Sequence, residues 1–305
     1  MNSVTVHAPA TLSNLCSGFD ILGMALEQPY DVITIKKIEG NDIVIKHLDN
    51  YGLTSDPRQN IAGVVLEAMR KSIQSDEGFE IIIDKKIKPG SGIGSSAASA
   101  AGVAVAANEI LQTNFTKQQL VQFAMEGEVL ASGSKHADNL APCIYGGLVL
   151  IRDTPTLDIV PINTPELFIT IVHPQIEIKT SYARSILPKE LPLKTAITQW
   201  ANVAGLVAGF LQHDYSLISR SLTDVVAEPV RSPLIPGFDE VRSRSLRVGA
   251  LGGGISGSGP SLFMLSETAD IAADVEKEMK SVYEQLGVEY KSYVTTIAKQ
   301  GVRIL

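Results

Sequence analysis

A segment rich in glycine and serine has the residue types of a loop that binds a chain of phosphates. Glycines tolerate positive φ angles and let the backbone come close to a ligand. The alanine-rich run that follows favours a helix, whose first N–H groups and positive dipole end would face the same ligand. The segment consists of Lys88, Pro89, Gly90, Ser91, Gly92, Ile93, Gly94, Ser95, Ser96, Ala97 and Ala98.

Polar side chains at both ends of the segment extend this chemistry. Ser95 and Ser96 carry hydroxyls that can reach a phosphate oxygen or Mg²⁺, and Lys88 adds a positive charge. The nucleotide-binding pattern G-x-x-x-x-G-K-[ST] is absent from the sequence, because no lysine follows Gly94. The residues suit a polyphosphate, and a glycine turn that binds no ligand stays an alternative.

A second glycine cluster resembles a dinucleotide site only formally. Gly252 to Gly257 match the pattern G-x-G-x-x-G. That pattern requires a helix directly afterwards. Here Gly259 and Pro260 intervene, and Ser261 to Leu265 have the composition of a strand. We interpret the cluster as a hairpin loop and not as a nicotinamide-nucleotide site.

The composition limits the class of protein. The chain has 305 residues, enough for two domains, and a net charge of −7, which argues against a general nucleic-acid binder. The longest apolar stretches, 97–107 and 201–211, are shorter than the roughly 20 residues of a membrane-spanning helix. No secretory signal is visible, and Cys16 and Cys143 are too few for a disulfide framework. We expect a cytoplasmic protein that binds neither membranes nor nucleic acid.

The pattern of apolar residues predicts an α+β fold. Strands are expected at 32–35, 43–45, 79–83, 148–151, 167–172, 262–265 and 290–297. Helices are expected after the cap Asn60, at 95–111, from a capping box at Thr116 to about residue 131, at 195–212 and at 269–286. Because the strands arrive in groups, a doubly wound sheet is disfavoured. Turn residues at 153–156 suggest a boundary between domains 1–152 and 153–305.

Three segments together resemble a known family. Pro89 to Ala98 are similar to the phosphate loop of the GHMP small-molecule kinases, Ala8 to Leu15 to their N-terminal motif, and Gly254 to Pro260 to their C-terminal glycine motif. The resemblance implies a ribosomal-protein-S5-like N-terminal lobe, a ferredoxin-like C-terminal lobe and an active site between them. It also implies ATP along Lys88 to Ala98, Mg²⁺ held by Ser96 and Glu128, transfer of phosphate to a small alcohol, and a possible homodimer.

The segment from Asn14 to Gly23 is similar to that of the family members whose acceptor is L-homoserine, with Cys16 where glycine is usual. The resemblance implies that Asn14 contacts a hydroxyl and that Asp20 holds the ammonium group. It assigns the carboxylate to Arg184 and Arg231, whose guanidinium groups suit it.

Residues 133–142 resemble the family segment with the pattern H-x-D-N. In relatives such as mevalonate kinases the aspartate at the position of Asp138 is the catalytic base, whereas His136 or Asn139 would orient the acceptor hydroxyl. The expected product is O-phospho-L-homoserine, an intermediate of threonine biosynthesis. A mevalonate-like or sugar-like acceptor is the first alternative, and a non-catalytic nucleotide-binding protein is the second.

Overall fold

The computed structural model describes residues 2–132 and 135–305. The start of the expected acceptor segment, Gly133 and Ser134, lies outside the described residues, as does Met1. The strands are β1 (Ser3–Ser13), β2 (Leu22–Ile38), β3 (Ile43–His47), β4 (Gly78–Asp84), β5 (Leu148–Asp153), β6 (Asp158–Ile162), β7 (Phe168–Pro174), β8 (Gly252–Ile255), β9 (Leu262–Ser266), β10 (Tyr290–Thr296) and β11 (Arg303–Ile304). The helices are α1 (Ile61–Ser72), α2 (Ser95–Ile110), α3 (Lys117–Ser132), α4 (Leu140–Tyr145), α5 (Thr180–Ser185), α6 (Leu193–Gln212), α7 (Tyr215–Ser221), α8 (Glu228–Arg231), α9 (Phe238–Arg247) and α10 (Ala269–Leu286), with a 3₁₀ turn at Ser232–Leu234.

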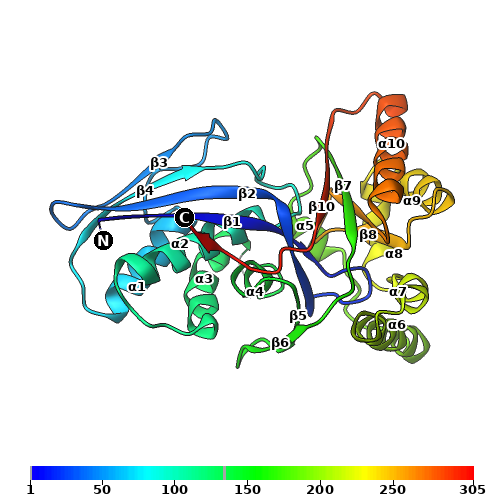
Figure 1. The fold of residues 1–305 in the computed structure, drawn as a ribbon, viewed down its shortest axis with the longest axis horizontal. Coiled ribbons are helices and arrows are strands. Elements are labelled where there is room, and N and C mark those ends of the chain that lie inside the picture. Colours follow the sequence, from blue (N-terminus) through cyan, green and yellow to red (C-terminus); the bar gives the residue numbers. More distant parts are fainter. Residues whose placement is uncertain (1, 133–134) are drawn as a thin grey trace.

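Two sheets lie side by side along the long axis of the molecule (Figure 1). The first contains seven strands in the order β11-β1-β2-β4-β3, with β5 paired to β2 and β6 paired to β5. Its centre is the antiparallel pair β1 and β2, in which Val6 lies opposite Ile33. The short turn between these strands, residues 14–21, extends toward the second sheet and is part of the site described below.

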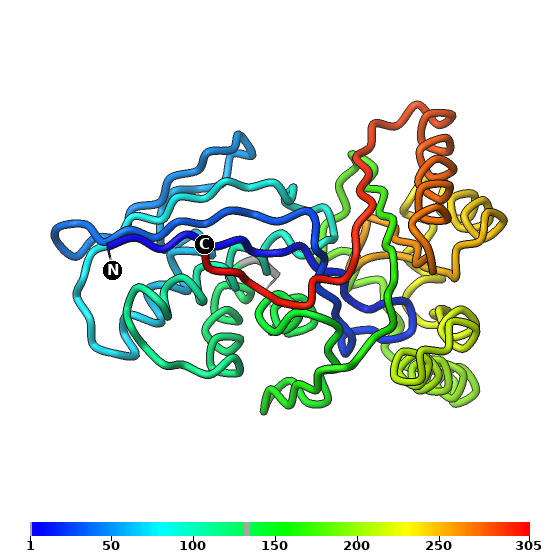
Figure 2. The backbone as a smooth tube through the Cα atoms, viewed as in Figure 1, coloured from blue at the N-terminus to red at the C-terminus, as the bar shows by residue number. Residues whose placement is uncertain are grey.

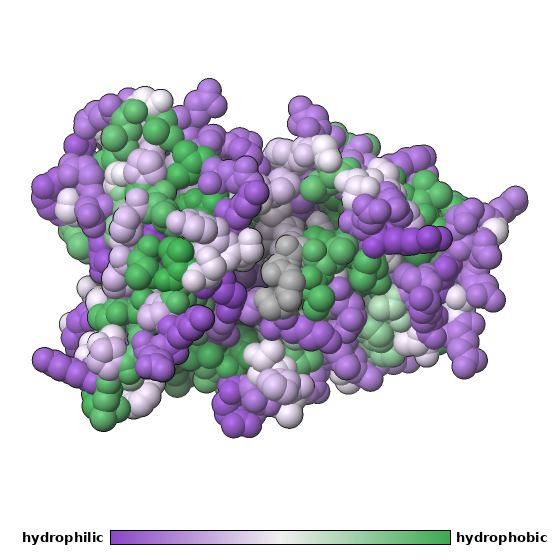
Figure 3. All heavy atoms as spheres, turned by 180° about the vertical axis from the view of Figure 1, so that it is seen from behind, coloured by the Kyte–Doolittle hydropathy of each residue, from purple (hydrophilic) through white to green (hydrophobic). Residues whose placement is uncertain are grey.

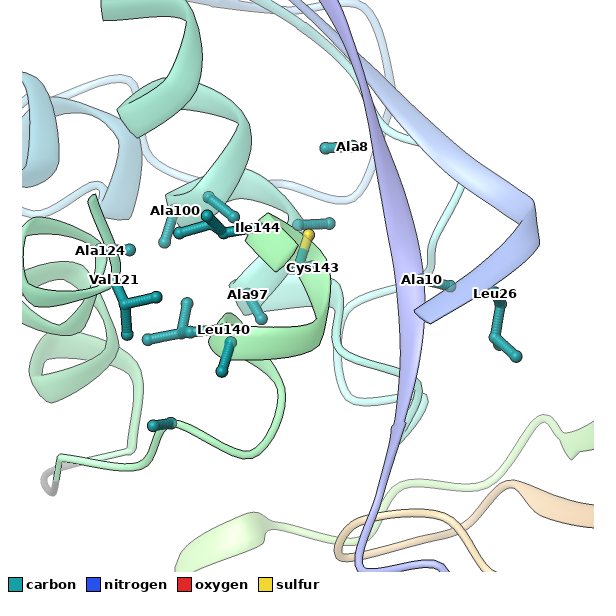
Figure 4. Packing of buried hydrophobic residues seen from close by; sticks show 14 of the residues in the cluster. Ala8, Ala10, Leu26, Ala97, Ala100, Val121, Ala124, Leu140, Cys143 and Ile144 are labelled. Atoms are coloured by element: carbon teal, nitrogen blue, oxygen red, sulfur yellow. The ribbon is translucent and has the colours of Figure 1, made fainter. Parts of the chain in front are cut away.

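Helices α1 to α4 cover one face of the first sheet (Figure 1). Helix α2 contacts β1, β2, α3 and α4, and small side chains make this close packing possible. Ala97 and Ala100 lie beside Val121 and Ala124 of α3 and Leu140 of α4 (Figure 4). The helix that follows the phosphate loop is therefore fixed on several sides by the core.

The second sheet has the order β10-β7-β9-β8, and α9 and α10 pack on it. Ile171 of β7 lies opposite Phe263 of β9, and a second apolar cluster fills the space beneath the helices. After β10 the chain returns to the first sheet, where β11 pairs with β1 (Figure 2). The two halves are thus tied together by the end of the chain as well as by its middle.

The expected α+β class and the expected strands and helices are confirmed, including the Asn60 cap and the Thr116 capping box. The sequence patterns did not predict β1, β6, β8, β11 and the short helices α4, α5, α7, α8 and α9. Strand β1 contains Pro9 where its pairing with β2 shifts register, which obscures the strand pattern. The boundary near residue 152 stays a prediction; β6 lies beyond it and pairs with β5.

Among the described residues, no helix combines the length and apolar character needed to cross a bilayer. On the face shown in Figure 3, apolar side chains form patches among hydrophilic ones.

Candidate active site

A cavity of about 470 Å³ collects residues from both halves of the molecule. Its walls come from the glycine loop before α2, the turn between β1 and β2, the segment before α4, helices α3, α5 and α8, and the loop after β8. The residues singled out in the sequence that line it are Asn14, Asp20, Pro89, Gly90, Gly92, Gly94, Ser95, Ser96, Glu128, His136, Asp138, Asn139, Arg184 and Arg231.

The glycine loop has the backbone that its sequence predicts. Gly90, Gly92 and Gly94 have φ angles of 74°, 82° and 72°, in the region that favours glycine. A Cβ on Gly94 would lie 2.0 Å from the Thr11 hydroxyl oxygen. Gly94 is also the N-cap of α2, so the unpaired N–H groups of that helix begin at the cavity. The loop is shaped and electrostatically suited to receive an anion.

A buried lysine lies under this loop and was missed in the sequence. Lys85 Nζ donates to the Asp31 carboxylate at 2.6 Å, to the Ser95 carbonyl at 2.9 Å and to the Ser99 hydroxyl at 2.9 Å. Burial raises the pKa of Asp31, and the adjacent Lys85 opposes that shift. In the sequence Lys85 is an ordinary basic residue after a strand, so nothing distinguishes it from its neighbour Lys86.

The second glycine cluster is the β8–β9 hairpin, and its loop packs on the first. The Ser256 hydroxyl donates to the Gly92 carbonyl at 2.7 Å. The Ser261 hydroxyl donates to the Ser91 carbonyl at 2.5 Å. A Cβ on Gly92 would lie 2.6 Å from the Gly259 carbonyl oxygen, so the two loops need glycine where they touch. A strand, not a helix, follows this cluster, which excludes the dinucleotide geometry.

Ser96 and Glu128 both line the cavity and bring hard oxygen donors to it. The Glu128 carboxylate also contributes to the raised pKa of Asp138, which places its charge close to that residue. Within the described part of the chain, no cluster of three or more His, Cys, Asp or Glu side chains could hold a metal ion. A hydroxyl and a carboxylate beside an anion-binding loop fit Mg²⁺, which takes few protein ligands and shares phosphate oxygens.

The turn between β1 and β2 has an unusual backbone. Asn14, Leu15, Cys16 and Asp20 have positive φ angles, and for Cys16, which replaces a usual glycine, the angle is 61°. The Asn14 amide holds this turn: its oxygen accepts from the Asp20 N–H at 3.0 Å, and its nitrogen donates to the Gly257 carbonyl at 2.9 Å. Asn14 thus joins the turn to the second glycine loop.

Two arginines converge on this turn from the second half of the chain. Arg184 donates to both carboxylate oxygens of Asp20, at 3.0 and 2.8 Å. Arg231 is buried and donates to the carbonyls of Ala183 and Gly257 at 3.1 and 3.0 Å. Both guanidinium groups lie by the Phe19 ring, 5.5 and 5.2 Å from its centre. Burial and the nearby Arg184 charge lower the pKa of Arg231. The two guanidinium groups, lying close together, form a local positive site.

Hydrogen bonds with side chains of β1 hold Asp138 and Asn139 in place. Burial, helped by the Asp20 charge, raises the pKa of Asp138 to about 7, whereas a hydrogen bond from Ser13 lowers it. The Asn139 amide accepts from the Thr11 hydroxyl at 2.8 Å and donates to the Ser13 hydroxyl at 3.0 Å. Burial and the Arg184 charge lower the pKa of His136, and the Asp20 charge opposes this shift.

Five of the residues expected along the nucleotide do not line the cavity. Ile93, Ala97 and Ala98 are buried in the core, Ser91 is buried beneath the second loop, and Lys88 donates to Gln175 Oε1 at 2.8 Å. Conversely, the cavity extends past Lys85 to residues that were not expected in the site, namely His47, Leu53, Thr54, Gln59, Asn60, Ile61 and Ile83. These side chains carry no motif, and only the fold brings them to the site.

Two family models match the chain and define its class. Residues 60–147 match the N-terminal domain of GHMP kinases, and residues 206–285 match their C-terminal domain. The two-sheet fold with a glycine cradle between its halves is therefore that of a GHMP kinase, and the fold implied by the resemblance is confirmed.

Relatives over the full length narrow the assignment. The homoserine kinase of Chloroherpeton thalassium is 44% identical over 100% of both chains. The crystal structure of homoserine kinase from Cytophaga hutchinsonii has a TM-score of 0.96 at 42% identity and covers 100% of this chain and 98% of that one. The chain belongs to the homoserine kinases within the GHMP kinase family. Methanococcus jannaschii mevalonate kinase, covering 96% of this chain and 98% of its own, shares the fold at 14% identity and a TM-score of 0.71.

Proposed function

We propose that this chain transfers the γ-phosphoryl group of ATP to the side-chain hydroxyl of L-homoserine, producing O-phospho-L-homoserine for threonine biosynthesis. One observation carries the choice of acceptor: Asp20, Arg184 and Arg231 meet in the cavity that the phosphate loop lines. A carboxylate and two guanidinium groups match the ammonium and carboxylate of an α-amino acid. A mevalonate-like alcohol has no ammonium group for Asp20.

On the donor side, the phosphates of ATP lie along Gly90 to Ser96, where positive-φ glycines and the first turn of α2 present N–H groups. The cavity continues beyond Lys85 to Leu53, Ile61 and Ile83, with the Asn60 amide among them. Apolar walls with an occasional amide suit a planar base. We therefore place the nucleoside at that end.

Ser96 and Glu128 would hold Mg²⁺ between the loop and α3. The ion neutralises phosphate charge that develops during transfer. Glu128 sits near Asp138, so its carboxylate also sets the electrostatics of the acceptor side.

On the acceptor side, Arg184 and Arg231 bind the carboxylate of homoserine and Asp20 binds its ammonium group. Its hydroxyl then lies toward Asp138, with His136 and Asn139 beside it. Because the pKa of Asp138 is raised to about 7, its carboxylate is a better proton acceptor than an ordinary aspartate. Asp138 takes the hydroxyl proton as the acceptor oxygen bonds to the γ-phosphorus, while the bond from that phosphorus to the bridging oxygen breaks and ADP leaves. Asn139 keeps Asp138 in place through Ser13.

We further propose a cytoplasmic homodimer. Leu193, Ile197, Trp200 and Leu211 of α6 are 68, 53, 61 and 55% exposed, and their spacing of four, three and eleven residues puts them on one face of the helix. A second copy of the same face would cover it. Light scattering should show a dimer that Trp200→Glu weakens and Leu48→Glu, at a 67% exposed position in the loop after β3, leaves intact; a monomeric wild-type chain would contradict the proposal.

A panel of acceptors tests the function. ADP formation is measured with Mg²⁺ and ATP in the presence of L-homoserine, R-mevalonate, galactose or no acceptor. We expect turnover with L-homoserine and background rates with the others. Turnover only on alcohols that lack an α-amino acid group would reject the acceptor, and no nucleotide binding would reject the kinase assignment.

A further inference from the structure

The two residues assigned to opposite charges of the substrate bind each other in the structure. Arg184 Nη1 and Nη2 donate to the two carboxylate oxygens of Asp20, in the side-by-side geometry that a substrate carboxylate would adopt. The side chains of Asp20 and Arg184 are 33 and 38% exposed, so the pair is open to the cavity. The protein's own carboxylate thus stands where the proposed function puts that of homoserine.

The surroundings of the pair keep both partners in place. The Asp20 N–H is bound by Asn14, and the Arg184 guanidinium lies by Phe19 and 3.5 Å from the His136 ring nitrogen. The buried Arg231 adds a positive charge close to Arg184. A partner that lost its counter-charge would therefore face a like charge: Arg184 would face Arg231, and Asp20 would face Asp138.

We propose that the Asp20–Arg184 pair selects zwitterionic acceptors by an exchange of ion pairs. This inference rests on the proposed function and deepens it. An α-amino acid replaces the internal ion pair with two new ones, since its carboxylate binds Arg184 and its ammonium group binds Asp20. A ligand with only one of these charges still has to break the pair and leaves one protein charge without a partner. Selection against such ligands thus comes from the protein's internal pair as well as from missing contacts.

The exchange makes a prediction that ordinary contact loss does not. Removing Asp20 frees Arg184, so a carboxylate without an ammonium group should bind better than it does to the wild type. Removing Arg184 frees Asp20, so an amine without a carboxylate should bind more tightly than it does to the wild type. If each residue acted only through its own contact, both substitutions would leave the singly charged ligands unchanged or weaker.

The test measures dissociation constants by calorimetry for L-homoserine, 4-hydroxybutyrate and 3-amino-1-propanol. These ligands carry both charges, the carboxylate alone and the ammonium alone. The variants are Asp20→Asn and Arg184→Met. We expect Asp20→Asn to increase the affinity for 4-hydroxybutyrate about three- to tenfold, and Arg184→Met to increase the affinity for 3-amino-1-propanol by a similar factor. The affinity for homoserine should fall at least tenfold in both variants.

Two controls separate the possible failures. Nucleotide affinity and melting temperature show whether each variant is folded, and one folded variant is enough to test the exchange if the other does not fold. If wild-type protein phosphorylates homoserine but neither singly charged ligand gains affinity, the exchange is wrong and the function stands. If wild-type protein neither binds nor phosphorylates homoserine, the proposed function fails first.

Discussion

The side chain of Gln199 donates a hydrogen bond of 2.8 Å to the backbone carbonyl of Ser17, which lies 182 residues earlier in the chain. The same amide nitrogen donates to Asp224 at 3.1 Å, and the amide oxygen accepts from the Val225 N–H at 3.0 Å. Asp224 in turn caps the segment that leads to Arg231. One buried amide therefore joins the turn that carries Asp20 to the helix that carries Arg231.

Gln199→Leu should loosen the acceptor side and spare the nucleotide side. The Ser17 carbonyl and the Val225 N–H would lose their partner, which costs about 1–3 kcal/mol for each unsatisfied group, whereas Asp224 keeps its backbone donors. We expect KM for homoserine to rise at least tenfold and KM for ATP to change less than twofold. Thr198→Ala, which changes the exposed neighbouring position, is the control. Equal effects on both KM values would contradict the role of Gln199.

Lys85→Met should destabilise the protein, because it leaves the buried Asp31 carboxylate without its cation. Breaking a buried pair from one side costs about 3–5 kcal/mol. Since burial already raises the pKa of Asp31, the loss should be larger at pH 8, where Asp31 must ionise, than at pH 5. Urea unfolding at both pH values measures this. Lys85→Met with Asp31→Asn should recover part of the loss, and a deficit independent of pH would contradict the account.

Asp138→Asn should raise the stability of the protein at pH 8 and lower its activity. Because the pKa of Asp138 is raised to about 7 by burial, the folded state holds a proton that the unfolded state releases between about pH 4 and pH 7. Ionised Asp138 is thus unfavourable above pH 7, so the variant should be more stable than the wild type at pH 8 and gain little at pH 4. Turnover should fall about 10²- to 10⁴-fold. Asp76→Asn, at an exposed position, should change neither quantity. A pH-independent difference in stability would show that Asp138 is not the group responsible.

Gly94→Ala should abolish nucleotide binding, because a Cβ there would lie 2.0 Å from the Thr11 hydroxyl oxygen. Gly287→Ala, at the end of α10 and outside the cavity, is the matched control: its φ angle of 65° is similar, but among the described residues no atom other than those of its chain neighbours lies within 4 Å of the added Cβ. The control should lose only about 1 kcal/mol of stability from backbone strain. Titration with a fluorescent ATP analogue compares the two. Similar affinities in both variants would mean that close packing at Gly94 is unimportant.

Local sequence patterns predict the parts of this molecule that local physics determines. The Pro89–Ala98 loop, the Asn60 cap and the α10 helix follow from glycine, capping and apolar spacing. The hydrogen bonds made by Gln199, Lys85 and Thr11 do not follow from local patterns, because their partners lie 182, 54 and 128 residues away in the sequence. Only the tertiary fold brings such partners together, and the same holds for the part of the cavity near Leu53 and Ile83.

The most direct test of the central claim is identification of the product by phosphorus NMR. Purified protein is incubated with Mg²⁺, ATP and L-homoserine, and the phosphorus spectrum is recorded with and without proton decoupling. We predict a new phosphomonoester signal, split by two protons of the adjoining CH₂ group, that grows in step with ADP. Formation of ADP with inorganic phosphate alone, or the same signal only with an alcohol that lacks the α-amino acid group, would contradict the account.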